Sequence, residues 1–334
     1  MNSKIKKSKN LWELVLTDSL DLKNLDINSF RKIGKDNSRL GTWDAIDPSS
    51  RYFKSLLYSN AENLDKKILQ SKFPFDSKSI DNKNKNKNKN KNKNKNGNGI
   101  RQYLKNIRNQ NLGNPPTVNY FNNEVSIDYL LSTEEMYFLD EILKESKTIL
   151  EIGAGFGRLA HSVIHNFKNI ERYIIIDLEP VLKLSRLYLS EVLNSKEFLK
   201  IDFISSDDIA SIKDLEGGID ISINVDSFQE MEESIILNYL DFISKNSTYF
   251  YSKNAICKYH PDSVDIQLKN QNHIDSALSM GLCKDIIDIF DSNAIQKARS
   301  IYLSKYCPRS FEISKKESCF GQYLYYYSAL YKHK

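Results

Sequence analysis

The sequence has little of what several specialised protein classes depend on. It contains 12 glycines and 4 cysteines in 334 residues, and no apolar run approaches the ~18 residues of a membrane-spanning helix. The cysteines lie far apart and lack C-x-x-C spacing, which favours reduced thiols over a disulfide framework or a zinc site. The basic amino-terminal stretch has no apolar segment behind it, so we expect no secretory signal. These absences predict a cytoplasmic globular protein without a membrane span.

The positive charge of the chain is concentrated in one segment. Residues 82–96 alternate asparagine and lysine, and their seven lysines exceed the net charge of +5, so the rest of the chain is net −2. Such a repeat buries no apolar surface, and we expect residues 76–100 to form a disordered linker. A nucleic-acid tether and a tolerated expansion in a loop both fit it, and the second is favoured. The slightly acidic remainder argues against a nucleic-acid partner.

Three of the few glycines lie in one short segment, Gly153, Gly155 and Gly157, directly after the apolar run 148–152. A strand, a glycine turn and a helix start together expose backbone N–H groups where polar or anionic ligands bind. The spacing Glu151-x-Gly-x-Gly-x-Gly differs from the G-x-G-x-x-G fingerprint of dinucleotide sites. It resembles motif I of the class I S-adenosylmethionine-dependent methyltransferases. A glycine turn without a ligand is the alternative interpretation.

The resemblance implies a binding site for S-adenosyl-L-methionine. In that family the glycine turn passes beneath the methionine part of the cofactor, and the acid at the position of Glu151 helps to orient it. The residues that the resemblance places at or near this part of the site are Glu151, Gly153, Ala154, Gly155, Gly157 and Arg158.

A second acid follows at the spacing that a nucleoside site requires. The apolar, β-branched run 173–177 predicts a buried strand that ends in Asp177, followed by Leu178. A carboxylate at this strand end can accept hydrogen bonds from two ribose hydroxyls, and both S-adenosylmethionine and NAD sites use this arrangement. Glu179 is a rival for the same role. Motif I favours S-adenosylmethionine.

The remaining sequence predicts the architecture around these motifs. Strands and helices alternate from residue 148, with further strands at 199–204, 218–225 and 248–252. This alternation predicts an α/β fold with a doubly wound, mainly parallel sheet, whose binding crevice lies at the carboxyl ends of its strands. Two final strand-like segments, 310–315 and 323–331, are joined by a turn at Gly321. They complete the seven-stranded Rossmann-like sheet with one antiparallel strand that is typical of class I methyltransferases.

Four regions follow from this pattern. We expect a helical cap at 1–75, the linker at 76–100, a helical lead-in or lid at 101–147 and the class I methyltransferase domain at 148–334. Within the lead-in, the segment Ser132–Glu135 predicts a helix start with a capping box. Its expected apolar face consists of Met136, Leu139, Ile142 and Leu143. A further helix is expected near 273–291.

Polar residues after the third and fourth predicted strands are candidates for the rest of the site. Asp207 or Asp208 corresponds to the acid that often binds the adenine amino group in class I methyltransferases, and a helix N-cap is an equal alternative. In this fold the loop 224–231 brings acceptor and methyl donor together, so Asn224 is a candidate cofactor contact. Candidate proton acceptors for an alcohol are Asp226, Glu230 and, beyond the fifth strand, His260. For each residue alone a structural interpretation is favoured: Asp226 as a helix cap, Glu230 on a helix surface and His260 in a loop. No cluster of acids or histidines compels a metal ion, and both a metal-dependent and a metal-independent reaction fit the sequence.

Three segments together resemble a narrower family of sugar O-methyltransferases, which are associated with bacterial surface-polysaccharide loci. They are Glu151–Ala160, the strand that ends in Asp177-Leu178, and Ser227–Met231, and the likeness covers roughly residues 110–260. It implies an enzyme that methylates a hydroxyl of a sugar, as part of a glycan or its activated precursor.

Other functions remain open alternatives. A small-molecule or protein methyltransferase of the same fold, or a cofactor-binding protein without turnover, fits the same motifs. A nucleic-acid methyltransferase is disfavoured because no base-flipping motif follows the fourth strand, and a dehydrogenase because the glycine spacing is wrong. No feature of the sequence specifies an oligomeric state.

Overall fold

The computed structural model describes residues 26–32, 51–72, 99–206, 218–260, 263, 271–319 and 324–334. Several residues named from the sequence lie outside this part of the chain: most of the Asn/Lys segment, the candidate adenine contacts Asp207 and Asp208, and the turn residue Gly321. None of the helices in the described residues is long and apolar enough to cross a membrane.

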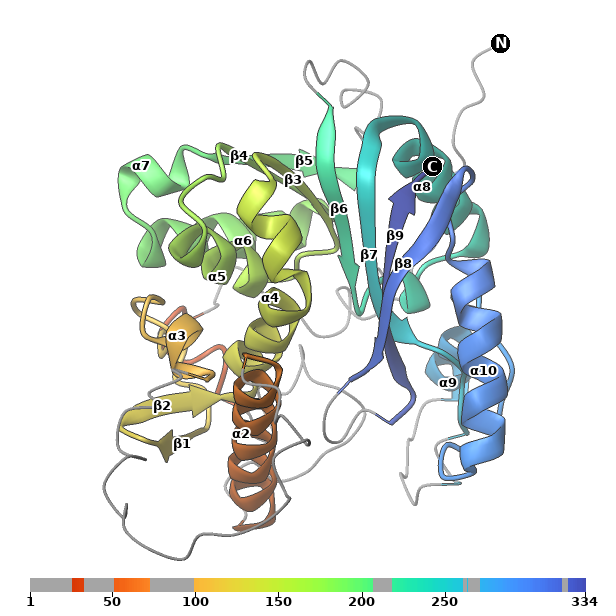
Figure 1. Ribbon diagram of the computed structural model, residues 1–334, viewed down its shortest axis with the longest axis horizontal. Coiled ribbons are helices and arrows are strands. Elements are labelled where there is room, and N and C mark those ends of the chain that lie inside the picture. The colour runs from red at the N-terminus through yellow and green to blue at the C-terminus, as the bar shows by residue number, and fades with distance from the viewer. Residues whose placement is uncertain are drawn as a thin grey trace, which may run out of the picture.

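A twisted sheet of seven strands organises the chain, in the order β5-β4-β3-β6-β7-β9-β8 (Figure 1). All neighbouring strands are parallel except β9, which runs antiparallel to both β7 and β8. This arrangement confirms the expected α/β class and the single antiparallel strand near the end of the chain. The strands are β3 (Thr148–Ile152), β4 (Arg172–Asp177), β5 (Ile201–Ser205), β6 (Ile219–Val225), β7 (Ser247–Ala255), β8 (Phe311–Ser318) and β9 (Tyr326–His333).

Helices cover both faces of the sheet because its central strands are apolar on both sides. One face packs against α4 (Ile127–Glu145), α5 (Arg158–Asn166) and α6 (Glu179–Val192). The other packs against α8 (Glu233–Asn246) and α10 (Ser292–Lys305). In β4 the alternate residues Tyr173 and Ile175 face the first cluster, whereas Ile174 and Ile176 face the second. The result is a three-layer sandwich with two apolar cores.

The region before the sheet differs from the expected helical lead-in. It contains an antiparallel hairpin, β1 (Thr117–Tyr120) and β2 (Asn123–Ser126), that leads directly into α4. Before it lie α2 (Arg51–Lys72) and the short α3 (Arg101–Leu104), and the similarly short α7 (Ser195–Phe198) follows α6. Side chains of α2 and α3, including Leu64 and Leu104, are buried in the same cluster as the first face of the sheet.

The predicted start of α4 is wrong. The helix begins at Ile127, and Ser132–Glu135 lie within it and are buried. The Ser132 and Thr133 hydroxyls donate to the carbonyl oxygens of Asp128 and Tyr129, one turn earlier, so they do not cap a helix end. The expected apolar face is confirmed, since Met136, Leu139 and Leu143 are buried and Ile142 packs against the core.

The segment after β7 also differs from expectation. The structure has α9 (Gln271–Ser279) where the sequence predicts a helix near 273–291, and the chain turns at Gly281, which has a φ of +80°. The second helix, α10, was not expected. Gly281 packs against Gln229, because a Cβ at Gly281 would lie 3.1 Å from the Cα of Gln229. The helix therefore ends where the backbone must approach the loop after β6.

A short amino-terminal segment, Asp26–Lys32, lies against the glycine turn. The ring of Phe30 packs edge-on against Phe156, with centroids 5.5 Å apart. The Arg31 guanidinium is buried and forms an ion pair with Asp128 at 2.7 Å. Arg31 also donates to two backbone carbonyls at 110 and 112. This segment therefore forms part of the wall behind motif I.

Candidate active site

The candidate site lies between β3 and β6, where the order in which successive strands are added to the sheet reverses. Strand order runs outward from β3 through β4 to β5 on one side, and from β6 to β7 on the other. Ligands of open α/β sheets bind in the crevice outside the carboxyl ends at such a switch point. The loops after β3 and β6 touch there, since a Cβ at Gly153 would lie 2.2 Å from the Ser227 hydroxyl oxygen. Only glycine fits at position 153.

The glycine turn leaves space beside Gly155. All three glycines have positive φ, and apart from its neighbours in the chain no heavy atom of the described residues lies within 4 Å of the position that a Cβ at Gly155 would occupy. The Ser185 hydroxyl holds the turn from behind by donating to the Gly155 carbonyl at 2.6 Å. Gly157 instead packs against the side chain of Leu189. The turn therefore presents one open face, at Gly155, and one packed face, against α6.

Asp177 lies at the end of β4 and faces this turn. Its carboxylate accepts hydrogen bonds from the backbone N–H of Gly155 at 3.0 Å and of Leu178 at 2.8 Å. Burial raises the pKa of Asp177 to about 7, although these two bonds oppose the shift. The side chain nevertheless keeps some contact with solvent. The rival acid, Glu179, is exposed at the start of α6 and lies 3.8 Å from Arg186. The geometry favours Asp177 for a ligand in the crevice.

Glu151 lies in β3, shortly before the glycine turn. It is 3% exposed, and its carboxylate accepts a hydrogen bond of 2.7 Å from the Tyr173 hydroxyl. Burial raises the pKa of Glu151 to about 7, while Tyr173 and Arg158 lower it. A carboxylate held in this environment is easier to ionise when a positive charge lies near it.

Arg158, the first residue of α5, is held by a buried ionic network that the sequence did not reveal. It donates to both carboxylate oxygens of Glu135 at 2.8 and 2.9 Å. Lys253 of β7 donates to Glu135 at 3.1 Å and to Glu134 at 2.8 Å. Burial disfavours the charged form of Glu135, but Arg158 and Lys253 outweigh it, so its pKa falls below the ordinary value. Two cations and two carboxylates thus join α4, α5 and β7.

Asn224, in β6, is fully buried. Its amide nitrogen donates to the Ile152 carbonyl at 2.9 Å and to the Ser227 hydroxyl, and its oxygen accepts from Asn254 at 2.8 Å. These bonds fix the loop after β6 against the end of β3. The side chain of Asn224 therefore positions the two loops.

Asp226, one of the three candidate proton acceptors, lies in that loop with a φ of +61°. Its Oδ1 accepts hydrogen bonds from the Tyr326 hydroxyl and from Gln229. The surrounding protein raises the pKa of Asp226, and the bond from Tyr326 opposes the shift. The side chain is nevertheless exposed to solvent. Protein groups therefore hold one oxygen of Asp226, while solvent or a ligand can still approach the residue.

Of the other two candidates, Glu230 lies in the same loop as Asp226, whereas His260 lies beyond β7. Glu230 ends the short helix η3 (Phe228–Glu230), whose Phe228 is fully buried in the second core. Lys258, half-buried, donates to the Gln229 carbonyl at 2.9 Å; burial lowers its pKa to about 8, and Glu230 opposes that shift. The His260 carbonyl accepts hydrogen bonds from Ser263. No group of three acids, histidines or cysteines in the described residues is arranged to hold a metal ion.

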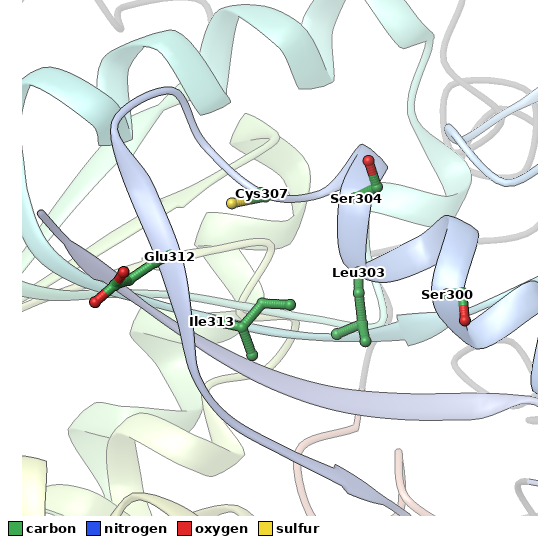
Figure 2. Close-up of a pocket in the computed structure, with 6 residues that line it drawn as sticks. All are labelled: Ser300, Leu303, Ser304, Cys307, Glu312 and Ile313. Atoms are coloured by element: carbon green, nitrogen blue, oxygen red, sulfur yellow. The ribbon is translucent and has the colours of Figure 1, made fainter.

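A separate recess of about 430 Å³ lies between α10 and β8 (Figure 2). β8 is parallel to β7, and the recess is lined by the first residues of β8, so it lies at the amino ends of the parallel strands. That is the opposite edge of the sheet from the glycine turn. The lining residues are Ser300, Leu303, Ser304, Cys307, Glu312 and Ile313.

Comparison with family models and with curated proteins found no match. Among solved structures, the mitomycin 7-O-methyltransferase MmcR is similar over 61% of this chain and 57% of its own, with 12% identity and a TM-score of 0.39. The methyltransferase domain of bacterial CtHen1-C is similar over 61% of this chain and 96% of its own, with 12% identity and a TM-score of 0.42.

Human N-acetylserotonin methyltransferase in complex with S-adenosylmethionine is similar over 62% of this chain and 54% of its own. Its identity is 13% and its TM-score 0.35. The chain thus spans little more than half the length of this enzyme and of MmcR. Such distant similarity says nothing about the substrate, so the interpretation of the site rests on its own geometry.

Proposed function

We propose that the protein is an S-adenosylmethionine-dependent O-methyltransferase that methylates a sugar hydroxyl, in a surface polysaccharide or its activated precursor. One observation carries the proposal. The glycine turn 153–157 lies at the switch point of a sheet with a single antiparallel strand, and a carboxylate at the end of β4 faces the turn. The narrower assignment to a sugar rests on the resemblance of Ser227–Met231 to sugar O-methyltransferases.

The residues present fit the cofactor. The open space beside Gly155 admits a ligand to the backbone, and the two oxygens of Asp177 retain lone pairs for two ribose hydroxyls. The buried Glu151 supplies negative charge under the turn, where the positively charged amino group of the methionine part would lie. Asp207 and Asp208 remain candidate adenine contacts.

The chain's own residues then perform three tasks in the proposed reaction. Bound S-adenosylmethionine supplies an electrophilic methyl group. Asp177 and the turn orient the nucleoside, and Asn224 holds the loop after β6 in place against β3. A residue of that loop receives the proton of the acceptor hydroxyl, for which Asp226, Glu230 and His260 are candidates. Much of the rate enhancement is expected from proximity of the reacting atoms.

Calorimetric titration with S-adenosylhomocysteine tests the proposal, with NAD as the control ligand. We expect micromolar binding of S-adenosylhomocysteine and none of NAD. Asp177→Ala removes two hydrogen bonds to a charged group and should weaken binding roughly 10- to 100-fold, with Asp177→Asn intermediate. Glu179→Ala is the matched control and should bind like the wild type. Binding of NAD alone, or of neither ligand, would reject the methyltransferase assignment.

Methylation assays across acceptor classes separate the remaining alternatives. Transfer to a peptide or to an aromatic small molecule, with none to sugars, would favour a protein or small-molecule methyltransferase of this fold. Cofactor binding without transfer to any acceptor would favour a non-catalytic binding protein.

A further inference from the structure

Three polar side chains from separate elements meet at the acceptor side of the candidate site. Asp226 follows β6, Gln229 lies in η3 and Tyr326 is the first residue of β9. The Gln229 side-chain nitrogen lies 2.5 Å from Asp226 Oδ1 and 2.6 Å from the Tyr326 hydroxyl oxygen, and that hydroxyl donates to the same Oδ1. Gln229 is itself fixed, because its oxygen accepts a bond of 2.7 Å from the backbone N–H of Ala255. The three groups form a closed hydrogen-bonded triangle.

The triangle leaves one carboxylate oxygen for a ligand. Within the described residues, the hydrogen bonds to the Asp226 side chain end on Oδ1. The backbone N–H of Asp226 donates to the Lys253 carbonyl at 2.9 Å, which fixes its left-handed conformation. A non-glycine residue in this conformation costs free energy, and such strain tends to occur at functional sites. Asp226 is an exposed residue as a whole, and its Oδ2 accepts no hydrogen bond from the part of the chain that the structure describes.

Aromatic rings surround the triangle, and the charged groups that act on Asp226, namely Arg158, Lys253 and Glu135, are paired with one another in the buried network. Tyr325 lies beside Tyr326, with ring centroids 5.1 Å apart, and Tyr259 lies edge-on to Tyr325, also at 5.1 Å. Tyr259 and Tyr325 are both half-buried. Aromatic faces next to a few placed polar groups suit a ring that is apolar on its faces and bears hydroxyls at its edge. The negative charge of Asp226 disfavours a phosphate or carboxylate at the same place.

We propose that Asp226, Gln229 and Tyr326 form the acceptor subsite for a neutral, polyhydroxylated ring. Asp226 Oδ2 accepts the proton of the hydroxyl that is methylated, while Gln229 and Tyr326 are positioning residues that hold Oδ1. The proposal rests on the proposed methyltransferase function. It is supported by the contact between Ser227, next to Asp226, and Gly153 of the glycine turn, which brings the subsite beside the expected donor.

The proposed step balances without a further reactant. A lone pair of the acceptor oxygen forms the new O–C bond, and the electrons of the breaking S–C bond stay on sulfur, which becomes a neutral thioether. The hydroxyl proton passes to the Asp226 carboxylate and from there to solvent, which the exposed side chain can reach.

The experiment compares four full-length proteins: wild type, Asp226→Asn, Tyr326→Phe and Tyr327→Phe. Tyr327 is the adjacent residue of β9, and the Arg299 guanidinium lies over its ring, away from the triangle's hydrogen bonds, so it is a matched control. Methyl transfer from labelled S-adenosylmethionine is measured from pH 5 to 9 with UDP-glucose, GDP-mannose and dTDP-rhamnose as acceptors. Calorimetry with S-adenosylhomocysteine is run on each protein. The Asp226 carboxyl is titrated by NMR in ¹³C-labelled wild type and Tyr326→Phe.

We expect Asp226→Asn to reduce transfer roughly 100- to 1,000-fold, in the range typical of a lost general base. Tyr326→Phe should reduce the rate of methyl transfer about tenfold. Both the acidic limb of its pH–rate profile and the midpoint of the Asp226 titration followed by NMR should move to higher pH. Tyr327→Phe should match the wild type. All four proteins should bind S-adenosylhomocysteine within about twofold of one another, since the triangle does not hold the donor.

Several outcomes would overturn the subsite while leaving the donor site intact. They are normal transfer by Asp226→Asn, a pH profile and NMR midpoint of Tyr326→Phe that superimpose on those of the wild type, or donor binding without methylation of any of the three sugars. Failure of the wild type to bind S-adenosylhomocysteine would instead overturn the proposed function, and the subsite with it.

Discussion

At the scale of single residues, two carboxyl groups of the candidate site hold their protons unusually tightly. Burial raises the pKa of both Glu151 and Asp177 to about 7. Glu151 lies in β3 and binds the Tyr173 hydroxyl, whereas Asp177 lies at the end of β4 and binds the backbone of the glycine turn. Burial makes each carboxyl costly to ionise, and a positively charged ligand nearby would offset that cost. These two residues therefore favour function at the expense of stability.

This cost can be measured at Glu151. In the unfolded chain a glutamate ionises near its ordinary pKa of 4.5, whereas folded Glu151 keeps its proton until about pH 7. The folded state thus loses stability as pH rises from 4.5 to 7, by about 3 kcal/mol. Glu151→Gln keeps an oxygen for Tyr173 and removes this loss. Urea unfolding should show the variant about 2–3 kcal/mol more stable than the wild type at pH 8, and little different at pH 4.5.

The exposed Glu191→Gln is the control and should not change the pH dependence of stability. Glu151→Gln should also weaken binding of S-adenosylhomocysteine at pH 8, where wild-type Glu151 is ionised. A stability difference that stays constant from pH 4.5 to 8 would contradict this account of Glu151.

At the scale of elements, the buried network of Arg158, Lys253, Glu134 and Glu135 joins α4 to both halves of the sheet. Arg158 begins α5 directly after the glycine turn, and Lys253 pairs with Val225 in the register of β7 and β6. The two cations and two carboxylates are all largely buried, so each depends on its partners. The network fixes the helix start that follows motif I relative to the strand beside Asp226.

A set of substitutions tests whether the ion pairs of this network stabilise one another. Glu135→Gln should be the most destabilising, by about 3–5 kcal/mol, because Glu135 is bound by both Arg158 and Lys253. Lys253→Met and Glu134→Gln should each lower the free energy of unfolding by a smaller amount. The double variant Lys253→Met with Glu134→Gln should lower it by less than the sum of the two single changes, because it removes both members of one ion pair. The exposed Glu141→Gln on α4 is the control. Additive costs in urea unfolding would contradict coupling through this network.

The same network shows what sequence patterns can and cannot predict. The spacing of Glu151, Gly153, Gly155 and Asp177 is local, and the structure places Gly153, Gly155 and Asp177 at the carboxyl ends of β3 and β4, where the alternation of strands and helices predicts the crevice. Lys253 and Glu134 are 119 residues apart in the chain, and Tyr326 and Asp226 are 100 apart. No periodicity connects such pairs. The segment Ser132–Glu135 resembles a capping box because its residue types are those of a cap. In the fold, however, the carboxylates of Glu134 and Glu135 pair with Lys253 and Arg158, which only the folded sheet brings near them.

At the scale of the whole molecule, the candidate site depends on nearly the full length of the chain. The wall behind motif I includes Phe30 and Arg31, the acceptor loop contacts Gly281, and Tyr326 comes from the last strand. Alternation of strands and helices was enough to predict the parallel sheet, because its apolar strands and connecting helices are local features. The hairpin β1–β2 was missed because each of its strands has only 4 residues, too few to show an alternation. The helix α10 was missed although Asp291 caps it and its buried residues Ile295, Ala298, Tyr302 and Leu303 have helical spacing.

This arrangement predicts where a bound donor will restrict motion. Hydrogen exchange followed by mass spectrometry, with and without saturating S-adenosylhomocysteine, should show slower exchange in peptides that cover 152–158 and 176–180. Peptides that cover 224–231 should slow as well, because Ser227 packs on Gly153 and Asn224 binds the Ile152 carbonyl. Peptides from α10 and the start of β8 should not change, because their recess lies at the amino ends of the strands. Protection confined to that recess would place the ligand at the wrong edge of the sheet and refute the site proposed at the glycine turn.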